Sequence, residues 1–155
     1  MQWLTWENVG VDRMASAWLI VRFIDGAAQF AFIPERAKPG ISEAEPFDIP
    51  GARLSHRHGQ STFHTILDEY RLQDPILERL AHLVDEADTL QEVSWEPAAV
   101  GLDWVCRGLR KICRNDTEAL QKGYAVFEGL YAYLGEEGHT PYNRPPTLAE
   151  TQEPS

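Results

Sequence analysis

Three histidines that lie close together are the part of this sequence best suited to chemistry. They are His56, His58 and His64. Imidazole is the commonest protein ligand for transition metals such as Zn, Fe and Mn. On a strand, His56 and His58 would point to the same side, and His64 would approach from the first turn of the next helix. We predict that His56 and His64 bind a metal, and His58 is a further candidate ligand. A polar surface loop that happens to be rich in histidine is the alternative.

Two carboxylates on otherwise apolar helix faces are suited to complete such a site. Asp88 follows Val84 by four residues, and Glu128 follows Tyr124 by four and precedes Tyr131 by three. A buried carboxylate is costly unless it is paired, hydrogen-bonded or bound to a metal. We therefore expect Asp88 and Glu128 to be oxygen ligands. For each one alone, a hydrogen bond to an arginine or to a tyrosine hydroxyl is the structural alternative.

A site of imidazole and carboxylate donors favours one divalent ion, with Fe or Mn preferred and Zn possible, over Cu(I). With open coordination positions, such an ion could activate oxygen species or a small-molecule substrate. The sequence therefore suggests a metal-binding domain that could act as a mononuclear metal-dependent oxidoreductase. A non-catalytic sensor of chromate or metal stress, or an accessory protein, is the rival interpretation.

The helix expected over residues 12–25 carries charged groups beside its apolar face. Asp12 is a suitable N-cap, and Asp25-Gly26 is a suitable end. We expect Asp12, Arg13 and Arg22 to orient metal ligands or to hold an anion. A core helix with a local ion pair on its rim is the alternative.

The elements expected around these residues make an α+β fold. Alternation and turn residues predict strands over 29–33, 47–49 and 53–56, whereas residues 61–135 are helical in pattern almost throughout. Helix starts are expected at Ser61 or Thr62, at Asp74-Pro75 and at Asn115-Asp116-Thr117-Glu118. We predict a mainly helical single domain over residues 1–135, with a small antiparallel sheet near its N-terminal third. A flexible Pro-rich tail is expected over 136–155.

Composition excludes several classes of partner and site. The chain has 155 residues and a net charge of −10 without any basic run, which argues against nucleic-acid binding. It has no apolar run of about 20 residues for a membrane span and no signal peptide pattern. Cys106 and Cys113 would lie roughly 10 Å apart on one helix, too far for a disulfide. Free thiols predict a cytoplasmic protein, and a homo-oligomer is possible.

The longest motif in the chain is Asp12-Arg13-Met14-Ala15-Ser16-Ala17-Trp18-Leu19-Ile20-Val21-Arg22-Phe23-Ile24-Asp25. It resembles the opening of the C-terminal domain of ChrB-type chromate-resistance proteins. The resemblance covers roughly residues 3–134 and continues through Pro46-Phe47-Asp48-Ile49, Ser55-His56, Thr62-Phe63, Ala87-Asp88-Thr89, Gly101-Leu102, Arg107-Gly108-Leu109 and Leu130-Tyr131. It implies a link to chromate: longer members act in chromate-responsive regulation, and related proteins have been linked to superoxide dismutation.

The chain departs from the family pattern at residues expected to bind the metal. The family usually has Cys-Thr-Phe-Asp where this chain has Ser61-Thr62-Phe63-His64, and Tyr-Asp-Ala-Leu-Tyr where it has Phe127-Glu128-Gly129-Leu130-Tyr131. His58 usually has no counterpart. A ligand set changed from Cys and Asp to His and Glu would suit a different metal or a different reaction.

Overall fold

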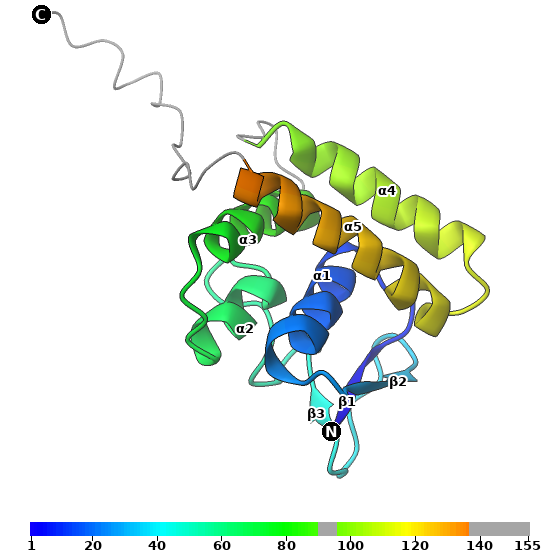
Figure 1. Cartoon of the computed structure of the whole chain (residues 1–155). Coiled ribbons are helices and arrows are strands. Elements are labelled where there is room, and N and C mark those ends of the chain that lie inside the picture. Colours follow the sequence, from blue (N-terminus) through cyan, green and yellow to red (C-terminus); the bar gives the residue numbers. More distant parts are fainter. Residues whose placement is uncertain (90–95, 137–155) are drawn as a thin grey trace, which may run out of the picture.

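A computed structural model of the chain describes residues 1–89 and 96–136, and in this part it has five α-helices and one small sheet (Figure 1). Helix α1 lies at the centre, α5 crosses over it, and α4 lies outermost. The sheet lies below α1. The elements run in the order β1 (Gln2–Trp6), α1 (Val11–Leu19), η1 (Ile20–Ile24), β2 (Gln29–Ile33), β3 (Glu45–Pro46), α2 (Thr62–Glu69), α3 (Pro75–Asp88), α4 (Ala98–Ile112) and α5 (Asp116–Glu136).

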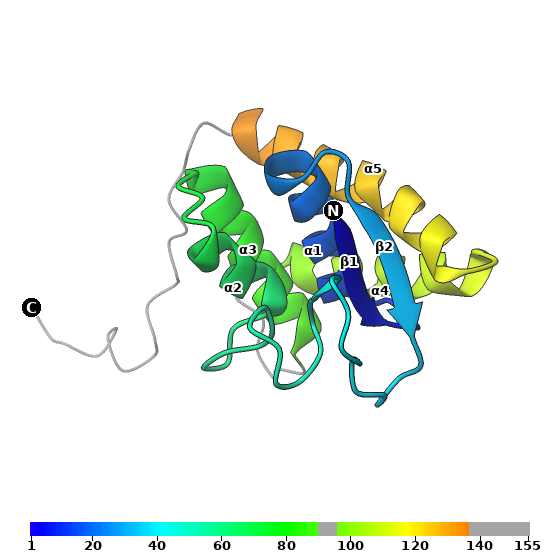
Figure 2. The same ribbon diagram turned by 90° about the horizontal axis from the view of Figure 1, so that it is seen from below.

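The three strands are all parallel and have the order β2-β1-β3. Strand β1 pairs with β2 from Gln2↔Gln29 to Trp6↔Ile33. The prediction of an antiparallel sheet was therefore wrong, although an α+β fold is correct. The reason is the helix between β1 and β2, which returns the chain to the starting end of the sheet before β2 begins. Seen from below, β1 and β2 lie in front of α1 and α5, with α2 and α3 to one side (Figure 2).

The segments expected to be strands over 47–49 and 53–56 form irregular structure instead. One parallel bridge, Phe47↔Leu54, joins them. Asp48, in the middle of the first segment, and Gly51, between the two segments, take positive φ angles of 53° and 88°. Such angles break the extended conformation that a hairpin strand needs, so the chain folds here as a compact turn. This turn places Asp48 and His56 on the same side of the molecule as the start of α1.

Helix α1 is the centre of the core, because all but one of its nine residues are buried. It begins one residue earlier than expected, and Gly10 rather than Asp12 is its N-cap. The α-helical part ends at Leu19, and η1 continues it in the π-helical conformation to Ile24. Because Asp12 does not cap its own helix, its carboxylate is available to another element.

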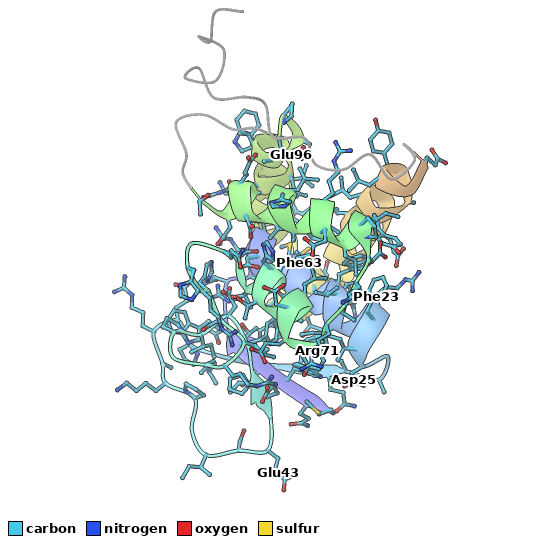
Figure 3. The ribbon with its side chains drawn as sticks, turned by 90° about the vertical axis from the view of Figure 1, so that its left-hand side faces the viewer. Phe23, Asp25, Glu43, Phe63, Arg71 and Glu96 are labelled. Carbon is cyan, nitrogen blue, oxygen red and sulfur yellow. The ribbon has the colours of Figure 1, made fainter. Side chains whose placement is uncertain are left out.

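The later helices begin where the capping residues predict. Ser61 accepts a hydrogen bond from the His64 N–H, and Asp74 with Pro75 starts α3. The Asn115 side chain accepts from the Glu118 N–H at 2.9 Å. Figure 3 shows Phe63 among the helices and Glu43 at the tip of the loop before β3. The largest buried side chains of the core include Trp3, Trp18, Phe47, Phe63 and Phe127.

Three further expectations concern the chain as a whole. Cys106 and Cys113 are both free, as their spacing predicts. Within residues 1–89 and 96–136, no helix is long and apolar enough to cross a bilayer. The tail predicted for 136–155 lies, beyond Glu136, outside the described residues.

Candidate functional site

Asp12 ties the start of α1 to the start of α2. Its side chain is only 2% exposed, and its two carboxylate oxygens accept the backbone N–H groups of Thr62 and Phe63, both at 2.9 Å. Phe63 marks this end of α2 in Figure 3. The first N–H groups of a helix have no partners within it and carry partial positive charge, so a carboxylate is favourable there. Asp12 thus has a structural role and a fixed orientation.

Asp48 lies beside Asp12 because the turn after β3 is held by side chains on α1 and α2. Its carboxylate accepts a hydrogen bond from the Thr62 hydroxyl at 2.6 Å and pairs with the Arg13 guanidinium at 3.1 Å. Arg13 also donates to the Asp48 carbonyl oxygen at 2.9 Å. Aspartate tolerates positive φ better than most residues do, which makes it a suitable residue here. These bonds hold the Asp48 carboxylate beside the imidazole ring of His56.

His56 lies in the loop before α2 and contacts three carboxylates. Its Nε2 is 2.6 Å from Asp88 Oδ2 and 3.3 Å from Asp12 Oδ2, and its Nδ1 is 3.1 Å from Asp48 Oδ1. Asp88 is the last residue of α3. One nitrogen and two oxygens, from His56, Asp12 and Asp48, lie within 4.8 Å of one another, as the ligand atoms of one metal ion would. We call His56, Asp12, Asp48 and Asp88 the His56 cluster.

The charges of this cluster are strongly coupled. Hydrogen bonds to Asp48 and Asp88 raise the pKa of His56 to about 10, so the imidazole is protonated at neutral pH when no metal is bound. Burial, followed by the nearby charges of Asp48 and Asp88, raises the pKa of Asp12 well above its ordinary value. Three carboxylates thus face two cationic groups, His56 and Arg13, and an added cation would relieve their repulsion.

A hollow of about 450 Å³ opens beside the His56 cluster. Its walls combine charged groups with apolar and small residues, and the Trp6 ring is held there by two contacts. The Trp6 ring N–H donates to the Ala37 carbonyl oxygen at 2.8 Å, and the Arg13 guanidinium lies 5.6 Å from the ring centre. The lining residues are Trp6, Arg13, Asp48, Ile49, Pro50, Gly51, Ser55, His56 and Asp88. The volume exceeds what one ion needs and falls in the range of small-molecule pockets.

The structure brings together only two of the four residues predicted to bind the metal, His56 and Asp88. His64 is held elsewhere: its Nδ1 lies 2.8 Å from Asp85 Oδ2, and its ring packs edge-on against His82. The bond to Asp85 raises the pKa of His64 and lowers that of Asp85. His58 is exposed at a positive φ of 48° in the loop before α2.

Glu128 and Arg22, predicted as a ligand and an anion holder, form a pair of their own. Arg22 Nε lies 2.8 Å from Glu128 Oε1, and the Trp18 ring N–H donates to the same oxygen at 3.2 Å. This is the structural alternative considered for Glu128, a carboxylate bonded to an arginine. Of the three residues expected around the ligands, Asp12 and Arg13 lie at the His56 cluster and Arg22 does not.

Sequence reasoning missed Asp48. The signal for it was weak: an aspartate between two buried apolar residues, Phe47 and Ile49, directly before the Pro50-Gly51 turn. A polar residue that interrupts an apolar run at a turn is common without any function. Only the contacts to Arg13 and Thr62 distinguish Asp48.

Comparison with known proteins identifies one family. A family model described as "ChrB, C-terminal domain" matches residues 3–134. Protein ChrB of Cupriavidus metallidurans is 33% identical over 136 residues, which cover 86% of this chain and 40% of ChrB. The chain thus spans less than half the length of this relative. No solved structure matches at a significant level.

Proposed function

This chain belongs to the ChrB C-terminal domain family, and we propose that it binds one divalent metal ion at the His56 cluster. The family suggests a function related to chromate resistance. The observation that carries the proposal is the approach of donor atoms from Asp12, Asp48 and His56 to within 4.8 Å of one another. Asp88 supplies a further oxygen 2.6 Å from His56 Nε2.

The chemistry of the donors fits a divalent ion. Carboxylate oxygens and one imidazole nitrogen suit Mn, Fe or Zn, and the cluster contains no thiolate that would favour Cu(I). Cys106, on α4, is buried, and burial raises the pKa of its thiol to about 12. We therefore propose Fe or Mn as the preferred ion, with Zn as a possible one.

The cluster already holds one positive charge, the His56 imidazolium, at the position that a metal would take, and this supports the proposal. In the metal-free state the His56 imidazolium lies between Asp12, Asp48 and Asp88. A metal needs the neutral imidazole, so binding would release the His56 proton and replace one positive charge with two. If Nε2 binds the ion, Nδ1 still faces Asp48, and a carboxylate in that position orients a metal-bound histidine.

A finer proposal is that the bound ion acts on a small molecule or an oxygen species. The specific observation in its favour is the hollow of about 450 Å³ beside His56, which leaves space next to an ion. The residues of the chain would then have distinct tasks: Arg13 fixes Asp48, and Trp6 forms a wall of the hollow. A metal sensor or accessory protein without catalysis is the competing proposal, because it needs the same ligands but no substrate.

Metal analysis of the full chain tests the proposal. The protein is stripped with a chelator, exposed separately to Mn(II), Fe(II) without oxygen and Zn(II), and its metal content is measured after desalting. One equivalent in the wild type, and far less in His56→Ala, supports the site. Equal metal content in wild type and His56→Ala, at equal folding by circular dichroism, would contradict it.

A second measurement separates the enzyme from the sensor. The metal-loaded protein is assayed for superoxide removal, and the hollow is altered at Pro50→Trp, an exposed position of its wall that carries no proposed ligand. An enzyme should lose activity in this variant while its metal content stays constant. Metal-loaded wild type without any activity favours the sensor.

A further inference from the structure

Thr62, the first residue of α2, has a hydroxyl group that the helix itself does not need. Its side chain is fully buried. Ser61 already caps the helix by accepting the His64 N–H, and Asp12 accepts the Thr62 N–H. A buried hydroxyl without a hydrogen bond is costly, so the partner of this hydroxyl must lie outside α2.

The hydroxyl of Thr62 lies against the His56 cluster. Its Oγ1 is 2.6 Å from Asp48 Oδ1 and 3.5 Å from His56 Nδ1. With the N–H bond to Asp12, Thr62 contacts three of the four residues of the cluster. The hydroxyl has one proton to donate. A distance of 2.6 Å is typical of a hydroxyl that donates to a carboxylate, whereas 3.5 Å is long for a hydrogen bond, so the proton goes to Asp48.

Each oxygen of the Asp48 carboxylate therefore has a partner of its own. Thr62 holds Oδ1, and Arg13 pairs with Oδ2 at 3.1 Å. A carboxylate that is bonded at both oxygens is hindered from turning about its last single bond. Oδ1 thus stays 3.1 Å from His56 Nδ1, where it can accept a hydrogen bond from that ring nitrogen.

The position of Asp48 decides which nitrogen of His56 is available to an ion. A neutral imidazole has one N–H and one nitrogen with a free lone pair, and the hydrogen bond made by the N–H selects the tautomer. The acceptors beside Nδ1 are Asp48 Oδ1 and Thr62 Oγ1, and both favour the proton on that nitrogen. Nε2 is then the free donor, and Nε2 is the nitrogen that faces Asp12 and Asp88.

We propose that Thr62 is a positioning residue of the metal site: its hydroxyl holds Asp48 at Nδ1 of His56, so that Nε2 is directed to the ion. This inference rests on the proposed function, because the hydroxyl has this task only if an ion binds at the His56 cluster. Groups that orient a metal ligand in this way commonly contribute about 10- to 100-fold to metal affinity.

The first test compares the metal affinity of variants at Thr62. Mn(II) is titrated into the chelator-stripped full chain, and the unbound ion is measured by its electron paramagnetic resonance signal. Thr62→Val keeps the shape of the side chain and the backbone N–H to Asp12, and it should raise the dissociation constant about 10- to 100-fold. Thr62→Ser keeps the hydroxyl, and it should bind Mn(II) with nearly the affinity of the wild type.

Thr65→Val is the matched control. Thr65 also lies on α2 and is only 1% exposed, but its hydroxyl donates to the Ser61 carbonyl oxygen and not to the His56 cluster. The control removes a buried threonine hydroxyl from the same helix and should leave the Mn(II) affinity unchanged. Urea unfolding of the metal-free proteins completes the comparison. A merely structural role of Thr62 would lower the stability of both valine variants without a selective loss of affinity in Thr62→Val.

The second test needs no substitution at Thr62, so it applies even if Thr62→Val does not fold. Zn(II) is diamagnetic, and nitrogen magnetic resonance of the histidine rings distinguishes a protonated nitrogen from a metal-bound one. In the Zn(II)-loaded wild type, His56 should have its proton on Nδ1 and the metal on Nε2. The reverse assignment would overturn the proposal, although the metal site itself would stand.

Failure of this proposal and failure of the proposed function give different results. If Thr62→Val binds Mn(II) as tightly as the wild type and Thr65→Val, Thr62 is not a positioning residue, but the metal site remains. Equal losses of affinity in Thr62→Val and Thr62→Ser also overturn the proposal, because the hydroxyl is then not the cause. A wild type that binds neither Mn(II) nor Zn(II) contradicts the metal site and, with it, the role of Thr62.

Discussion

His56 Nε2 lies 2.6 Å from a carboxylate oxygen of Asp88, although 32 residues separate the two in the sequence. The contact joins the loop before α2 to the last residue of α3. Both positions were proposed as metal ligands from the sequence, and Asp12 and Asp48 lie against the same imidazole.

His56→Ala should abolish stoichiometric metal binding, because it removes the only nitrogen of the cluster. His64→Ala should leave the metal content unchanged, because His64 is bonded to Asp85 rather than to the His56 cluster. Metal content after desalting, measured for both variants beside the wild type, checks this. If His64→Ala loses its metal while it stays folded, His64 is a metal ligand after all, and the site as described here is wrong.

The affinity for metal should fall as the pH falls. The metal-free cluster holds the His56 proton with a pKa of about 10, so an incoming ion must displace it. If one proton leaves, each unit of pH below that pKa weakens the apparent affinity about tenfold. Titration calorimetry between about pH 6.5 and 8, in two buffers of different ionisation enthalpy, counts the protons released. An affinity independent of pH would contradict this exchange.

The stability of the metal-free protein should fall as the pH rises. The pKa of His56 is raised on folding from its ordinary 6.5 to about 10, so its contribution is complete below 6.5 and is lost toward 10. The raised pKa of Asp12 acts in the same direction. Urea unfolding in the presence of a chelator, at about pH 6 and pH 9, should show this loss. His56→Gln should reduce the slope, and the remaining slope reports partly on His64, whose pKa is also raised.

Asp12→Ala should destabilise the fold by about 3 kcal/mol even without metal. The change leaves the N–H groups of Thr62 and Phe63 without their acceptor, and an unsatisfied buried donor costs about 1–3 kcal/mol. Asp68→Ala is the control, because Asp68 lies exposed on α2, and we expect a change below about 1 kcal/mol. Urea unfolding of both variants measures the difference. Equal losses would mean that Asp12 does not hold α2.

Trp18→Ala should cost about 3–5 kcal/mol in the free energy of unfolding. Trp18 is 2% exposed, and its ring contacts Phe23, Phe127 and Tyr131. Trp18→Phe should cost much less, because it keeps most of the packing and loses only the hydrogen bond to the half-exposed Glu128. Thermal unfolding compares the two. A small loss in Trp18→Ala would show that α1 is not the centre of the core.

Local patterns in the sequence determined the helices and their starts. Asp74-Pro75, Asn115-Asp116-Thr117-Glu118 and Ser61 predicted helix starts that the structure confirms. Such predictions succeed because a cap acts within one turn of its own helix. The free thiols of Cys106 and Cys113 followed from spacing along one helix in the same way.

Only the tertiary structure decided the direction of the strands and the composition of the cluster. Whether β1 and β2 run parallel depends on the path of α1 and η1 between them, and not on the residues of either strand. His64 and Glu128 have the residue types of ligands, but Asp85 and Arg22 are their partners. Asp48 carried little signal, yet a turn at positive φ and the contacts of Arg13 place it beside His56. The type of a residue determines what its side chain can bind. The partner that the side chain actually contacts lies tens of residues away in the chain, so local spacing does not reveal it.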